Sequence, residues 1–254
     1  MNPNLRQTRI AQLIVVLACA MAIKLYYSTA SVNDLLWILA PTTLLVELIT
    51  GVGFAFESNA GYMSSDHSFL IAASCSGVNF LITAFLMLSL GRLWKCRTQI
   101  ISWIFIPLSM LAAYLTTILA NTFRISTALQ IRRLDPELIW LNPDQFHRFE
   151  GIVVYFGFLL LLFVVSEKIG SQNDASPKAT AGLLKRSLLP LLIYYATTLG
   201  VPLANGLYRS GLATSDFWEH SLFVLLVPAL LLWVLASLSF FNDRRSLLRV
   251  RRWH

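Results

Sequence analysis

Residues 69–90 read FLIAASCSGVNFLITAFLMLSL and contain the stretch Ser74-Cys75-Ser76-Gly77-Val78-Asn79-Phe80. The run is long enough for a helix that crosses a bilayer, which needs about 20 apolar residues. It nevertheless carries a thiol, hydroxyls and an amide, and polar side chains in hydrocarbon are costly and usually functional. If the run is helical, Cys75 and Asn79 lie one turn apart on the same face. The stretch therefore predicts a membrane helix that holds a candidate site.

The composition of the whole chain supports this reading. Of its 254 residues, 56% are hydrophobic and only 13% are charged, and the mean hydropathy is +0.65. A soluble domain of ordinary composition carries about 25% charged residues. The composition therefore predicts an all-α, polytopic transmembrane helical bundle that forms one integral-membrane domain, residues 1–254.

Apolar runs of membrane-crossing length recur along the chain and predict about seven spans. The second is the shortest and contains Pro41, so it is also compatible with a re-entrant segment. Between the spans we expect an outer loop at 51–68, a longer polar segment at 121–148, a flexible inner linker at 166–186 and a basic tail at 242–254. The predicted spans are residues 10–27, 35–50, 69–90, 100–120, 149–165, 187–203 and 222–241.

The positive charge follows the pattern that membrane insertion favours. The net charge of +7 is concentrated in short loops and in the arginine-rich tail, which predicts a cytoplasmic C-terminus and contact with anionic lipids rather than with nucleic acid. Counting back from the tail places 166–186 and 91–99 inside, and 51–68 and 121–148 outside. Seven spans then put the N-terminus outside, although Arg6 and Arg9 favour the opposite side. The protein is expected in the plasma (inner) membrane, with the outer ends of the spans that carry Cys75, Arg124 and His147 on the extracytoplasmic side.

Two further residues could act with Cys75. Arg124 follows an apolar span and shares a helical face with Asn121; a guanidinium there could stabilise a thiolate or an oxyanion. His147 opens the fifth span one turn before Gly151, and histidine is the usual general base for a thiol. Taken alone, Arg124 is more simply an arginine that binds lipid phosphate, and His147 an interfacial histidine.

Cys75 alone would also be more simply a small buried side chain, as we interpret Cys19 and Cys96. A metal site from Cys75, His147 and His67 has no supporting ligand spacing, so neither a metal nor another cofactor is expected. A nucleophile, a base and an oxyanion donor that meet at one interface are, however, what acyl transfer requires.

These residues also carry a family resemblance. Ser74-Cys75-Ser76-Gly77, then Asn121-Thr122-Phe123-Arg124, then His147 four residues before Gly151 resemble in order and spacing the motifs of the exosortase/archaeosortase family of membrane cysteine transpeptidases. The resemblance covers a motif-bearing core of about residues 54–163, and the segment Cys75–Phe80 is most similar to the short K-type exosortases.

The resemblance implies a thiol protease and transpeptidase of protein sorting, with Cys75 as nucleophile, His147 as general base and acid, and Arg124 as stabiliser of thiolate or oxyanion. Ser76, Asn79 and Asn121 would be supporting donors. The implied substrates are exported proteins with a C-terminal motif, a transmembrane helix and a basic cluster. The enzyme would cut before the helix and transfer the product to a membrane-associated acceptor, a lipid or glycan precursor.

Two other functions remain open at this point. A non-enzymatic transport or assembly subunit would tolerate loss of Cys75 and would depend on Arg124 or Glu47. A purely hydrolytic intramembrane protease would use the same residues and would release a free carboxylate instead of a conjugated product.

Overall fold

The computed structural model describes residues 3–96, 101–132, 143–170, 179–200, 203, 221–235 and 237. The chain divides into two compact units, Met1–Phe158 and Leu159–His254, and each is described by itself. The candidate residues that the structure describes all belong to the first unit.

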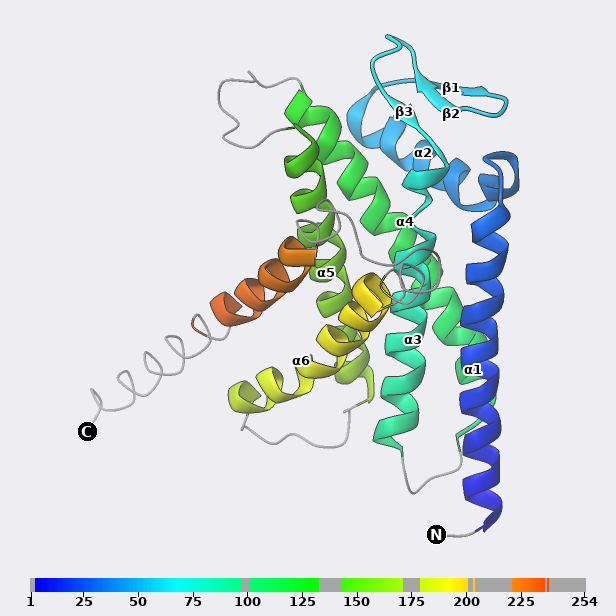
Figure 1. The fold of residues 1–254 in the computed structure, drawn as a ribbon, viewed down its shortest axis with the longest axis vertical. Coiled ribbons are helices and arrows are strands. Elements are labelled where there is room, and N and C mark those ends of the chain that lie inside the picture. The colour runs from blue at the N-terminus through cyan, green and yellow to red at the C-terminus, as the bar shows by residue number, and fades with distance from the viewer. Residues whose placement is uncertain are drawn as a thin grey trace, which may run out of the picture. The chain divides into compact units, whose positions relative to one another are not determined.

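The first unit is built mainly from helices (Figure 1). Helix α3 packs against both α1 and α4, and α2 packs against α4. The large side chains that these helices bury completely include Leu39, Phe85 and Phe156. The helices are α1 (Pro3–Thr29), the short η1 (Asn33–Leu35), α2 (Leu36–Thr50), α3 (Val78–Lys95), α4 (Phe105–Arg132) and α5 (Pro143–Gly170), of which the part up to Phe158 lies in this unit.

Five helical stretches of the described chain are long and apolar enough to cross a membrane. They leave large apolar side chains on the outside, as lipid-facing helices do; Leu48, for example, is 73% exposed. The predicted class, a mostly helical membrane protein, agrees with this finding, but the number of seven spans is not confirmed. The five stretches are Asn4–Thr29, Asn33–Thr50, Ala73–Lys95, Phe105–Ile131 and Arg148–Ile169, and two shorter apolar helices, Ser187–Gly200 and Ser221–Leu235, coincide with the last two predicted spans.

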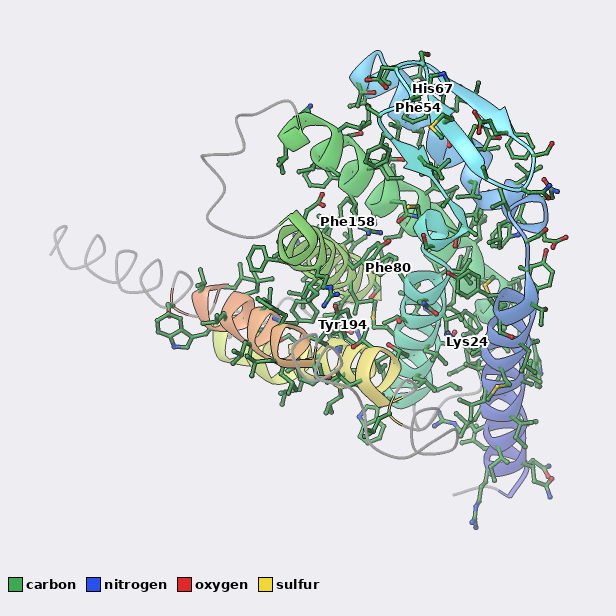
Figure 2. The ribbon with its side chains drawn as sticks, turned by 45° about the horizontal axis from the view of Figure 1, so that its top comes forward. Lys24, Phe54, His67, Phe80, Phe158 and Tyr194 are labelled. Atoms are coloured by element: carbon green, nitrogen blue, oxygen red, sulfur yellow. The ribbon has the colours of Figure 1, made fainter. Side chains whose placement is uncertain are left out.

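The predicted outer loop is a small antiparallel sheet in the order β1-β2-β3. Its strands are β1 (Phe54–Glu57), β2 (Gly61–Ser64) and β3 (Leu70–Ile71). Phe54 and His67 mark this sheet in Figure 2. The turn from β2 to β3 is closed by Asp66, which accepts hydrogen bonds from Ser64 Oγ (2.6 Å), Ser68 Oγ (2.8 Å) and the Ser68 N–H (3.1 Å). These bonds, the one from Ser64 above all, lower the pKa of Asp66 to about 2.

The third predicted span does not begin as a helix. Its first residues form β3, a short 3-10 helix, η2 (Ala73–Ser76), follows, and α3 starts only at Val78. Gly77 separates η2 from α3 with φ of +71°, a left-handed conformation that glycine adopts without steric cost. The expectation that Cys75 and Asn79 share one helical face is therefore wrong.

Two other boundaries differ from the sequence prediction. Helix α4 continues to Arg132, so Asn121 and Arg124 lie within a helix and not in a polar segment between spans. The predicted linker 166–186 is helical at both ends, because α5 runs to Gly170 and α6 (Ala179–Tyr195) begins before the linker ends. A π-helical turn, Ala196–Gly200, follows α6. Residues 171–178 and the basic tail 242–254 lie outside the described residues.

Candidate active site

Cys75 lies in the short turn between the sheet and α3. Its N–H donates to the Ala72 carbonyl (2.9 Å), and its side chain is half-buried and not in a disulfide. The left-handed Gly77 then redirects the chain into α3. Cys75 is thus presented by an irregular turn, where neighbouring elements can reach the backbone as well as the thiol.

Asn121 of α4 makes that contact. Its Nδ2 donates to the carbonyl oxygen of Cys75 (2.9 Å), and the residue is fully buried. A Cβ atom on Gly77 would stand 2.5 Å from the same Nδ2. Gly77 therefore serves two purposes: it permits the left-handed turn, and it leaves room for the amide that fixes the backbone at Cys75.

Tyr155 of α5 connects this amide to the arginine. Its hydroxyl donates to Asn121 Oδ1 (2.5 Å) and accepts a hydrogen bond from Arg124 Nη1 (3.0 Å). The ring stacks on Phe80 of α3 at a centroid distance of 4.9 Å, and Figure 2 shows Phe80 between α3 and α5. A continuous chain of hydrogen bonds thus runs from the Cys75 carbonyl through Asn121 and Tyr155 to Arg124.

Arg124 contacts Tyr155 and lies close to the α5 backbone at Gly151. Its guanidinium carbon lies 5.4 Å from the centre of the Tyr155 ring, within the range of a cation–π contact. A Cβ atom on Gly151 of α5 would lie 3.4 Å from Arg124 Nε, an ordinary van der Waals distance, so the α5 backbone lies close to the guanidinium. Arg124 also interacts electrostatically with Cys75 and with the buried Glu150. A guanidinium fixed in this way is a donor that can stabilise negative charge as it develops during acyl transfer.

His147 lies on α5, but its side chain is outside the described residues. Its position is one turn before Gly151 and two turns before Tyr155, which places it on the same face of that helix. This is the face on which Gly151 and Tyr155 meet Arg124.

The hydrogen-bonded chain does not include the other predicted supporting residues, Asn79 and Ser76. Asn79 is exposed and accepts a hydrogen bond from Lys24 Nζ of α1 (2.8 Å); Figure 2 shows Lys24 on the side of α1 that faces α3. Ser76 is fully buried, and its hydroxyl has no hydrogen-bond partner among the described residues. His67 belongs to the β2–β3 turn, and the described residues contain no group of three potential metal ligands.

Tyr155 and Glu150 belong to the site in the structure but are not among the residues predicted from the sequence. Tyr155 had one usable signal, its spacing of four and eight residues from Gly151 and His147, which indicates a shared helix face. For Glu150, the sequence gives no signal beyond a charged residue at the start of an apolar run.

Comparison with known proteins finds no family model that matches the chain, and no curated protein or solved structure with significant similarity to it. The features that point to a function are the geometry of the cluster formed by Cys75, Asn121, Arg124 and Tyr155 and the motif resemblance.

Proposed function

We propose that this protein is a membrane cysteine peptidase of the exosortase type that acts as a transpeptidase. One observation carries the proposal: Asn121, Tyr155 and Arg124 form a hydrogen-bonded chain that ends on the backbone of Cys75. A cysteine with only a packing role needs no such arrangement, in which two further helices contribute polar side chains and the last of them, Arg124, is a half-buried cation.

The reaction has two balanced halves. His147 takes the proton of the Cys75 thiol, and the thiolate attacks the scissile carbonyl carbon while Arg124 stabilises negative charge. The peptide C–N bond breaks, the amine leaves with the proton from His147, and a thioester remains on Cys75. An amine or hydroxyl of the acceptor gives its proton to His147 and attacks the thioester carbonyl carbon. The C–S bond then breaks, and His147 returns the proton to the Cys75 sulfur.

The substrates follow from the motif resemblance. They are exported proteins with a C-terminal motif, a transmembrane helix and a basic cluster, and the acceptor is a membrane-associated lipid or glycan precursor. The reaction takes place on the extracytoplasmic side of the inner membrane, and the basic tail contacts anionic lipids. No metal or organic cofactor takes part in these steps.

The test compares three alanine variants in membranes of the native host. Cys75→Ala should stop processing of exported proteins that carry such a tail, so that the longer precursors accumulate. Cys19→Ala and Cys96→Ala, which replace the other half-buried cysteines, should process normally. Insertion is checked by accumulation of each variant in the membrane fraction. Normal processing by Cys75→Ala would refute the proposal and favour a transport or assembly role.

A further inference from the structure

The strand β3 is an edge strand that leads directly to Cys75. It pairs with β2 on one side, and no further strand lies beyond it in the described sheet. Ala72 follows in an extended conformation (φ −87°, ψ 177°), and the turn with Cys75 comes next. Figure 1 shows β3 continuing into α3, whereas β1 lies on the other side of β2.

The pairing register shows which backbone groups face the open side. Ser64 N–H donates to the Phe69 carbonyl (2.9 Å), and the register then pairs Met63 with Leu70 and Tyr62 with Ile71. In an antiparallel pair, hydrogen-bonded and non-hydrogen-bonded pairs alternate. Leu70 is therefore in a non-hydrogen-bonded pair, and its N–H and C=O point away from β2.

The same alternation directs the Ala72 N–H to the open side, about 7 Å further along the chain at roughly 3.3 Å per residue. The Ala72 carbonyl is already used, because it accepts the N–H of Cys75. Leu70 N–H, Leu70 C=O and Ala72 N–H thus form a short row of open groups that ends where the chain turns to the nucleophile. Within the described residues, no hydrogen bond is formed to any of the three, and Leu70 is 37% exposed.

The opposite edge of the sheet does not offer the same arrangement. The backbone N–H of Phe54 at the start of β1 donates to Glu47 Oε1 (2.7 Å), so part of that edge is occupied. A strand beyond β1 would also be separated from β3 by three strand spacings, about 14 Å. Of the two edges of the described sheet, the β3 edge is the one that joins open main-chain groups to the residue that attacks the substrate.

We propose that the substrate binds as an added strand on the β3 edge. The occupant is the extended segment of the exported protein that precedes its transmembrane helix, and its main chain pairs with Leu70 and Ala72 so that the scissile carbonyl reaches Cys75. Addition of an extended peptide to a sheet edge is an established mode of peptide recognition, in which main-chain hydrogen bonds supply the affinity. This inference rests on the proposed function of Cys75.

The test uses two alkylating probes on the full chain in nanodiscs. Iodoacetamide reports only the reactivity of the thiol, whereas acetyl-Ala-Ala-Ala-chloromethyl ketone also requires a bound extended peptide. The rate at which each probe labels Cys75 is measured by peptide mass mapping. Ala72→Pro removes one open N–H at a φ close to the range of proline, and the matched control Ala72→Ser keeps that N–H.

The expected result is a selective loss in Ala72→Pro. Its rate with the peptide probe should fall about 2–13-fold, as for the loss of one hydrogen bond of roughly 0.5–1.5 kcal/mol. Its rate with iodoacetamide and both rates of Ala72→Ser should stay unchanged. The wild-type protein is also labelled with three further probes, each N-methylated at one of the three probe amides. Labelling should fall for methylation at alternate amides only, because alternate N–H groups of a paired strand face β3. This second measurement also holds if Ala72→Pro does not fold.

Other results separate the two proposals. Equal labelling of wild type by all N-methylated probes would overturn strand addition and leave the role of Cys75 intact. Failure of Cys75 to react with either probe, while Cys75→Ala still processes substrates, would overturn the proposed function itself.

Discussion

Removal of the Tyr155 hydroxyl tests the hydrogen-bonded chain at its centre. Tyr155→Phe keeps the ring that stacks on Phe80 and faces the Arg124 guanidinium. It deletes only the donation to Asn121 and the acceptance from Arg124. Any effect on Cys75 therefore reports the two hydrogen bonds and not the packing of the ring.

The magnitude follows from these two bonds. Hydrogen bonds between membrane helices contribute about 0.6 kcal/mol on average and up to about 1.7 kcal/mol, so two of them contribute about 1–3 kcal/mol. At about 2–4 °C per kcal/mol for a unit of this size, the Tm should fall by about 2–12 °C. Each kcal/mol by which Arg124 stabilises the negative charge that develops during the reaction of Cys75 corresponds to about a fivefold change in rate. The alkylation rate of Cys75 should then fall about fivefold.

The assay measures thermal unfolding in detergent and the iodoacetamide rate at Cys75 in the same preparation. Tyr114→Phe is the matched control in the same unit, because the Tyr114 hydroxyl donates to the Trp37 carbonyl (2.7 Å) and its ring stacks on Trp37. The control should lose some stability and keep the alkylation rate of Cys75. If iodoacetamide alkylates Cys75 as fast in Tyr155→Phe as in wild type, Tyr155 does not position Arg124.

Three further substitutions or conditions test the surrounding geometry. Gly77→Ala should destabilise the fold more than Gly51→Ala, because both have φ near +70° but only the Cβ at Gly77 meets Asn121; the strain alone costs about 1–2 kcal/mol, and thermal unfolding measures the difference. Gly151→Leu should displace the guanidinium and reduce processing at least tenfold, whereas Gly151→Ala should process normally. The Asp66 carboxylate has a depressed pKa of about 2, so its stabilisation of the β2–β3 turn should be complete above about pH 4 and disappear as the pH falls through 2; limited proteolysis against pH, with Asp66→Asn as control, measures this.

The sequence predicted the class of fold because apolar runs and low charge leave few alternatives for a chain of this kind. It did not predict the sheet at 54–71, because four-residue strands such as FAFE and GYMS give too short a pattern to distinguish from a loop. It also began the third span at Phe69, whereas α3 begins at Val78, since Gly77 looks like an ordinary small residue in an apolar run until its positive φ is known.

At the site, motif spacing identified the residues that have local signals. Cys75, Asn121 and Arg124 stand out as polar groups next to apolar runs, and the structure brings them together. Asn79 stood out in the same way and lies elsewhere, because the break at Gly77 turns it toward Lys24. Tyr155 is the opposite case: a tyrosine within a long apolar helix is common, and only its partners on another helix reveal a polar role.

The central claim is that Cys75 forms a covalent acyl intermediate. The most direct measurement adds hydroxylamine to host membranes that contain wild type or Cys75→Ala and searches the released exported proteins by mass spectrometry for a C-terminal hydroxamate. The account predicts hydroxamate-terminated products with wild type, because hydroxylamine cleaves thioesters, and none with Cys75→Ala. Cleaved products without hydroxamate, in equal amounts from both proteins, would contradict it.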